Sequence, residues 1–208
     1  MTDYLARPKE TVRGAILVLH AWWGLNEVIR QFCDRLAGEG YLVLAPDLYQ
    51  GGIAATIAEA KKLRSKMDRD AVRRQIAAAT DRLAGLPEGD GKPIGLIGFS
   101  LGAFFAFGLL DKKPAEIAAL VAYYGLGGGK FVKTRAAFLG HFAEDDDFEP
   151  VQAVMDFEQL LREAGKQVDF HIYPGTRHWF CEPDRPEYDP QAAGLAWERT
   201  VAFLNEHL

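Results

Sequence analysis

Short apolar runs recur along the chain and alternate with segments whose apolar residues lie three or four positions apart. The runs cover residues 15–19, 42–45, 94–98, 118–124, 136–140 and 168–173. Runs of this length that are apolar on both faces are typical of buried parallel strands. The last run alternates apolar with polar residues, which indicates a strand nearer the edge of the sheet.

Helical spacing fills the gaps between these runs. Apolar stripes run through residues 28–37, 53–84, 156–164 and 191–208, and the second stripe is long enough for one helix or two. This alternation predicts an α/β fold. We expect a mostly parallel sheet of about six to eight strands with helices on both faces, in a single domain spanning residues 1–208.

A candidate nucleophile follows the third run. Gly98, Ser100 and Gly102 form the pattern G-x-S-x-G between a predicted strand and a predicted helix. Such a turn is so sharp that it lifts the serine above the sheet and points the helix N-terminus at it. Glycine and serine are common residues, so the pattern also arises by chance, but the flanking strand and helix favour a catalytic serine. The backbone N–H of Leu101 is then a candidate oxyanion donor.

A candidate base follows the last run. His178 comes after Pro174 and Gly175, at the carboxyl end of the last predicted strand, where ligands of parallel sheets bind. His171 lies inside that strand and His207 lies at the chain end, so both are poor candidates. His141 is a weaker alternative to His178 because it is close in sequence to the candidate acids.

Three adjacent aspartates, Asp145, Asp146 and Asp147, follow the strand predicted over residues 136–140. One of them is expected to orient the base, and the others to face solvent or to cap the helix that Pro150 opens. The residues alone leave the choice open. The chain order serine, aspartate, histidine is the order found in α/β-hydrolases.

The loop after the first strand carries His20, Ala21, Trp22 and Trp23. In this architecture the loop supplies a second oxyanion donor, which we assign to the backbone N–H of Trp22. We interpret His20 as a structural brace of the loop. Residues 48–70 and 125–133 are the segments long enough to cover the site, so we expect a minimal lid. Four further residues are candidates for the substrate pocket: Trp23, Phe99, Arg177 and Trp179.

Composition narrows the class of protein. The 208 residues carry a net charge of −5, whereas proteins that bind nucleic acids or anionic membranes typically carry an excess of positive charge. No spacing of histidine and cysteine suggests a metal site, and no glycine-rich loop suggests a nucleotide, so no cofactor is expected. Cys33 and Cys181 are expected to be idle thiols. With no apolar N-terminal segment typical of a signal peptide, a cytoplasmic location is expected. We expect a monomer or a small homo-oligomer.

Several stretches resemble the dienelactone hydrolase family of α/β-hydrolases. Residues 23–26 resemble its aromatic-Gly-x-Asn, and residues 40–49 resemble its G-Y-x-x-x-x-P-D-L-Y. Residues 98–102 match its nucleophile elbow, and residues 178–180 resemble its H-x-F. Residues 146–150 resemble its D-x-x-x-P, and this resemblance selects Asp146 as the acid of a Ser100, His178 and Asp146 triad.

The chain departs from the founding members of that family in two places. They carry cysteine where this chain has Ser100, and a glutamate that tunes the thiol where this chain has Ala21. The two changes agree, because a serine nucleophile needs no thiol-tuning carboxylate. The family also binds the lactone carboxylate with arginines, and Arg177 and Arg185 lie near the histidine in sequence.

The sequence therefore predicts a serine hydrolase that cleaves small carboxylic esters or lactones through an acyl-enzyme. Two alternatives stay open. One is a non-catalytic α/β-hydrolase-fold protein that binds ligands or partners, and the other is an acyltransferase or peptidase that uses the same triad.

Overall fold

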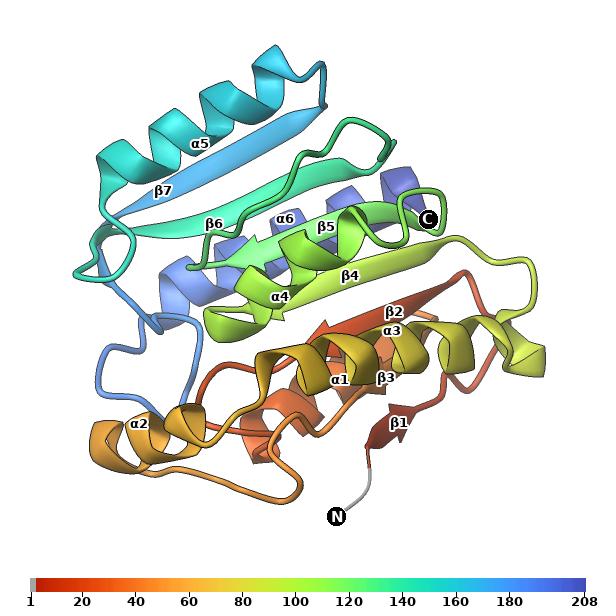
Figure 1. Ribbon diagram of the computed structural model, residues 1–208, viewed down its shortest axis with the longest axis horizontal. Helices are drawn as coiled ribbons and strands as arrows, with labels where there is room; N and C mark the ends of the chain where they lie inside the picture. The colour runs from red at the N-terminus through yellow and green to blue at the C-terminus, as the bar shows by residue number, and fades with distance from the viewer. Residues whose placement is uncertain (1–2) are drawn as a thin grey trace.

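A computed structural model describes residues 3–208 of the protein. Within this range seven strands form one sheet in the order β1-β3-β2-β4-β5-β6-β7 (Figure 1). Only β1 pairs antiparallel with its neighbour in the described part of the chain. The mostly parallel α/β sheet predicted from the apolar runs is confirmed. The strands are β1 (Tyr4–Ala6), β2 (Gly14–Leu19), β3 (Tyr41–Ala45), β4 (Ile94–Phe99), β5 (Ile117–Tyr123), β6 (Ala137–Asp145) and β7 (Val168–Arg177).

Helices cover both faces of the sheet, as the alternating pattern predicts. On one face lie α3, α4 and α5, and on the other lie α1 and α6 (Figure 1). The helices are α1 (Glu27–Gly38), α2 (Ile57–Ser65), α3 (Arg69–Ala84), α4 (Leu101–Leu110), α5 (Val151–Glu163) and α6 (Pro190–His207), with a 3₁₀ helix η1 (Pro87–Gly89) before β4.

Strand β2 shows how the two apolar layers are divided. Every residue of β2 is buried, and neighbouring residues point to opposite faces. Ala15, Leu17 and Leu19 join the core under α3 and α4. Ile16 and Val18 join the core under α1 and α6. A continuous apolar run is therefore the pattern that a doubly covered parallel strand requires.

The edges of the sheet differ in detail from the prediction. Strand β1 has three residues, too few to show a periodicity, and was not predicted. Strand β7 lies at the opposite edge, as its alternating pattern indicates. The last predicted run ends at residue 173, but the strand continues through Pro174 and Gly175 to Arg177. The register shifts there, and the Glu144 carboxylate braces the bulge by accepting from the Gly175 N–H at 2.8 Å.

The long stripe predicted over residues 53–84 is two helices. A capping box between Thr56 and Glu59 starts α2, and the Asp68 carboxylate caps α3. Within α2 only Ala60 is buried, among residues that are all described. The helix lies beyond the carboxyl ends of the strands rather than on a face of the sheet (Figure 1). No helix within residues 3–208 is both long and apolar enough to span a membrane.

Helix α4 begins in direct contact with the ends of β2 and β4. A Cβ atom on Gly102 would lie 2.1 Å from the carbonyl oxygen of Leu19, and one on Gly98 would lie 2.5 Å from Cα of Ala103. Both approaches are to backbone, which cannot move aside cheaply. The two glycines of the G-x-S-x-G pattern therefore allow α4 to start against the sheet.

We expect Gly102→Ala to lower the free energy of unfolding by about 3 kcal/mol, because the added methyl group overpacks against fixed backbone. Urea denaturation measures this change. Gly108 provides the matched control in the same helix, since a Cβ there meets nothing within 4 Å. Gly108→Ala should raise stability by up to about 1 kcal/mol through helix propensity. Equal effects at both positions would contradict the close contact.

Candidate active site

Ser100 occupies a sharp turn between β4 and α4. Its backbone has φ 48° and ψ −109°, a conformation that residues with a side chain rarely adopt. The surroundings hold it there, because the Ser100 N–H donates to the carbonyl of Tyr123 at 2.9 Å. A Cβ on Gly125 would lie 2.5 Å from the carbonyl oxygen of Ser100. The turn is thus packed from below and presents the serine at the carboxyl edge of the sheet.

Three side chains meet at this edge in a continuous line. Oγ of Ser100 lies 2.9 Å from Nε2 of His178, and Nδ1 of His178 lies 2.7 Å from Oδ2 of Asp146. A carboxylate only accepts, so Nδ1 carries the imidazole proton and Nε2 is left to accept from the serine hydroxyl. The side chain of Asp146 is fully buried, which strengthens its attraction for a positive imidazolium.

The structure separates the three aspartates by burial. Asp145 and Asp147 are exposed, whereas Asp146 is buried. Oδ1 of Asp146 accepts from the backbone N–H groups of Phe148 and Glu149 at 2.8 and 3.1 Å. These two bonds fix the carboxylate so that its other oxygen faces His178.

The other histidines of interest are held in structural networks. Nδ1 of His20 lies 2.6 Å from the carbonyl of Ala21, and Nε2 accepts from the Leu48 N–H at 3.1 Å. Burial lowers the pKa of His20, so it braces the loop after β2 as a neutral ring. His141 is also buried, and it contacts the hydroxyls of Tyr173 and Thr200 rather than Ser100.

The two cysteines, Cys33 and Cys181, are free thiols. Burial raises the pKa of both, which keeps the thiols protonated. Residues 3–208 contain no group of three or more His, Cys, Asp or Glu side chains arranged to hold a metal ion.

A cavity of about 240 Å³ opens above Ser100. It is lined by Trp22, Arg64, Arg69, Ser100, Leu101, Phe104, Leu126, Phe148, Glu149, His178 and Trp179. Of the four sequence-predicted pocket residues, Trp179 is therefore at the cavity wall.

The other predicted pocket residues lie elsewhere. Phe99 points into the apolar layer under α1, where its ring stacks on Tyr123 at 4.5 Å. Trp23 packs behind Trp179 with ring centroids 5.1 Å apart. Arg177 is exposed and lines a separate hollow beside the three aspartates. Strand alternation explains the position of Phe99. Phe99 and Ile97 are two residues apart in β4, so both point to the same face of the sheet, into the layer under α1.

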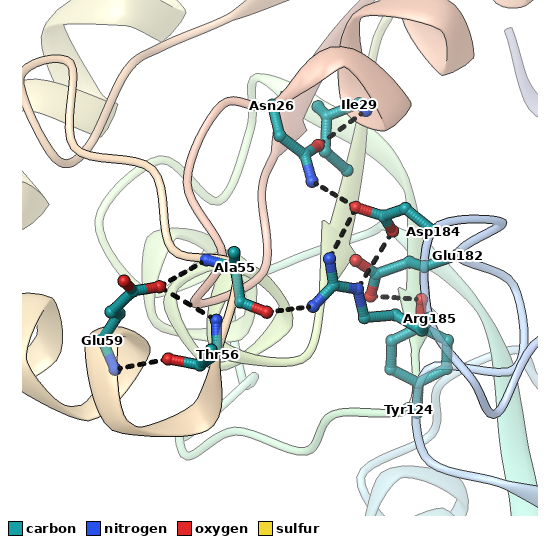
Figure 2. Close-up of polar contacts among 9 residues, drawn as sticks. All are labelled: Asn26, Ile29, Ala55, Thr56, Glu59, Tyr124, Glu182, Asp184 and Arg185. Carbon is teal, nitrogen blue, oxygen red and sulfur yellow. Dashed lines mark hydrogen bonds and ion pairs between the residues drawn. The ribbon is translucent and has the colours of Figure 1, made fainter.

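Arg185 does not line the cavity but joins two segments around it (Figure 2). Its guanidinium donates to the Asp184 carboxylate at 3.1 and 2.8 Å and to the carbonyl of Ala55 at 3.2 Å. It also lies 4.3 Å from the ring centre of Trp23. Asp184 in turn accepts from the side-chain amide of Asn26 at 3.3 Å. The loop after β7 is thereby tied to the segment before α2.

Sequence reasoning missed two arginines and one acid in the cavity wall. Arg64 and Arg69 come from α2 and the start of α3, and neither forms an ion pair within residues 3–208. Glu149 accepts from the Leu126 N–H at 3.1 Å, and burial raises its pKa. No local pattern marks these residues, because each reaches the cavity only through tertiary packing.

A central strand that runs through a strained serine turn into a helix, in a doubly covered sheet with this strand order, is the architecture of the α/β-hydrolases. The comparisons with known proteins agree. The model of the Dienelactone hydrolase family matches residues 1–208. Protein usf from Aquifex pyrophilus is 34% identical over 217 residues, with 99% of this chain and 93% of the relative covered.

Two solved structures resemble the fold at low sequence identity. Dienelactone hydrolase from Anabaena variabilis has a TM-score of 0.72 at 18% identity, covering 99% of this chain and 91% of its own. The dienelactone hydrolase-like promiscuous phosphotriesterase P91 from metagenomic libraries has a TM-score of 0.82 at 20% identity, covering 100% and 99%. The chain belongs to the dienelactone hydrolase family. Membership places it among the enzymes that hydrolyse small-molecule esters or lactones.

Proposed function

We propose that this protein is a serine hydrolase that cleaves small carboxylic esters or lactones through an acyl-enzyme. The observation that carries the proposal is the line from Ser100 through His178 to Asp146, with contacts of 2.9 and 2.7 Å. It opens into a cavity, and the nucleophile and base are within hydrogen-bond reach, as nucleophilic catalysis requires.

The chemistry follows from the positions of the protons. Oγ of Ser100 attacks the acyl carbonyl while Nε2 of His178 takes the hydroxyl proton. The imidazolium returns that proton to the leaving alkoxide, and the ester bond breaks to leave an acyl-serine. Asp146 holds the imidazole tautomer and stabilises its positive charge. Water, activated by the same histidine, then releases the acid and restores the serine.

The backbone N–H groups of Leu101 and Trp22 are proposed to bind the oxyanion. Leu101 is the first residue of α4, where N–H groups have no helical acceptor. In the described part of the chain, neither N–H donates a turn or side-chain hydrogen bond. Both residues line the cavity with Ser100. Loss of one such donor typically raises the barrier by about 3 kcal/mol.

The cavity supports a small substrate with an acidic group. Its volume of about 240 Å³ lies below that of most drug-sized ligand sites. Trp22, Phe148 and Trp179 supply apolar walls. Arg64 and Arg69 supply two cations that form no ion pair among residues 3–208. The Glu149 carboxyl also lines the cavity, but burial raises its pKa and favours the neutral form. We propose an ester or lactone that carries a carboxylate on its acyl or alcohol side.

Ser100→Ala should abolish hydrolysis of short-chain p-nitrophenyl esters and small lactones, lowering kcat by about 10⁴-fold or more, because the acyl-enzyme cannot form. Steady-state turnover with purified protein measures this. An unchanged melting temperature shows that the variant is folded. Turnover retained by the variant contradicts the assignment. If the wild-type protein turns over nothing and a fluorophosphonate fails to label Ser100, the protein is a non-catalytic member of the fold.

Asp146→Asn should lower kcat by about 10³- to 10⁴-fold, because an amide no longer fixes the imidazole tautomer. Asp145→Asn is the matched control, since the neighbouring carboxylate is exposed and should change kcat by less than about two-fold. Both variants are measured with the same ester. The opposite ranking would move the acid by one residue.

The double variant Arg64→Met/Arg69→Met should raise KM for a carboxylate-bearing ester by about five- to ten-fold while KM for a neutral ester stays the same. The effect is modest because both arginines are exposed, and added salt should reduce it in the wild type. Arg73→Met/Arg74→Met, which removes two exposed cations from α3, is the control. Parallel changes for the two esters would rule out a charge-specific role.

A further inference from the structure

The loop that follows β7 carries a buried carboxyl group that the proposed triad does not use. Glu182 lies four residues after His178 and has no exposed surface. One of its oxygens accepts from the hydroxyl of Tyr124 at 2.9 Å (Figure 2). The other oxygen is buried without a hydrogen-bond partner among residues 3–208. An unpaired buried oxygen destabilises a fold, so a carboxyl kept in this place calls for a functional reason.

Tyr124, the other partner of this hydrogen bond, lies next to the serine turn and to His178. It follows β5 in the left-handed region, at φ 37°, and its N–H donates to the carbonyl of His141 at 2.7 Å. The residues on both sides of it touch the serine turn: the Tyr123 carbonyl accepts from the Ser100 N–H, and a Cβ on Gly125 would lie 2.5 Å from the Ser100 carbonyl oxygen. The buried ring of Tyr124 lies 5.0 Å from the ring of His178.

Three aromatic rings lie against the imidazole of His178. Phe148 has its ring centroid 4.7 Å away and is half-exposed. Trp179, with its centroid 4.9 Å away, and Tyr124 are both buried. Tyr124 is thus one of two buried walls of the imidazole, and it is the one whose hydroxyl is anchored to Glu182.

The turn between His178 and Glu182 is itself strained. Trp179 has φ 70°, and the turn is closed by the Glu182 N–H donating to the Trp179 carbonyl at 2.8 Å. A strained turn persists only where contacts with the surrounding structure hold it in place. The Tyr124 to Glu182 hydrogen bond supplies such a contact, because it joins the far end of the turn to the end of β5.

We propose that Tyr124 and Glu182 are a positioning pair for the histidine of the proposed triad. This inference rests on the proposed function of the same site. Neither residue touches the reacting atoms. Together they hold the imidazole so that one nitrogen faces Ser100 and the other faces Asp146.

Burial is the main cause that raises the pKa of Glu182, to about 8. The hydrogen bond from Tyr124 opposes this rise, as does the charge of Arg185, whereas Asp184 and Glu187 add to it. The Arg185 guanidinium is already bonded to Asp184, and the thiol of Cys181 beside Glu182 is kept protonated by burial. A raised pKa means that the neutral group's contribution is complete at low pH and is lost as pH rises through about 8.

The test compares kcat and KM for an activated ester from neutral pH to about pH 10. Tyr124→Phe and Glu182→Leu should each lower kcat by about ten-fold with KM nearly unchanged, because a misplaced imidazole slows chemistry without altering the cavity. Glu182→Gln keeps a neutral acceptor for the tyrosine hydroxyl. It should retain kcat at neutral pH and lose the decline that the wild type shows above about pH 8.

Tyr41→Phe is the matched control. The Tyr41 hydroxyl is bonded to Asn205 at the same 2.9 Å, at the opposite end of the sheet strands from the serine. This variant should lose stability comparable to that of Tyr124→Phe but keep its kcat. The proposal is overturned if Tyr124→Phe and Glu182→Leu keep the wild-type kcat, or if Glu182→Gln shows the same alkaline decline as the wild type.

A second readout needs no turnover. The proton on Nδ1 of His178, shared with Asp146, gives a downfield NMR resonance when the imidazole is held in place. It should broaden or vanish in Tyr124→Phe and Glu182→Leu and persist in Tyr41→Phe and Glu182→Gln. If no ester is hydrolysed, the proposed function fails while this resonance still decides the positioning role. An unchanged resonance in all four variants overturns it.

Discussion

The close contact between the first turn of α4 and the ends of β2 and β4 is the constraint on which the rest of the structure depends. Gly98 and Gly102 permit this contact because any side chain at either position would collide with backbone. Gly125 likewise leaves room for the carbonyl of Ser100. Ser100 is held in a strained backbone conformation, with φ 48°. Because the surrounding backbone enforces this geometry, the residue is presented at the carboxyl edge of the sheet.

The partners of the serine come from the far edge of the sheet, where β6 and β7 end. The register shift near Gly175 changes the course of β7 just before His178 begins the following loop. Two backbone N–H groups orient Asp146 from the turn after β6. The edge of a sheet tolerates such a bulge because only one neighbouring strand must accommodate it. The irregular end of the sheet thus orients Asp146 and His178.

The chain has Ser100 in the nucleophile-elbow pattern and an uncharged residue, Ala21, in the loop after β2. A buried carboxyl lies in the loop after His178, where Glu182 meets Tyr124. Arg185 ties the same loop to the segment that leads into α2 (Figure 2). Polar contacts around the site therefore link the loop that bears His178 to β5 and to the segment before the helix that carries Arg64, so the position of His178 and the shape of the cavity share one support.

The sequence by itself determined the sheet, the serine turn and the place of the histidine. These features are local: apolar runs encode buried strands, and the G-x-S-x-G spacing encodes the close approach of α4. The tertiary structure alone decided that Arg64 and Arg69 reach the cavity while Phe99 does not. It also brought together Tyr124 and Glu182, which are 58 residues apart. Such contacts depend on how elements pack, and no spacing along the chain records that.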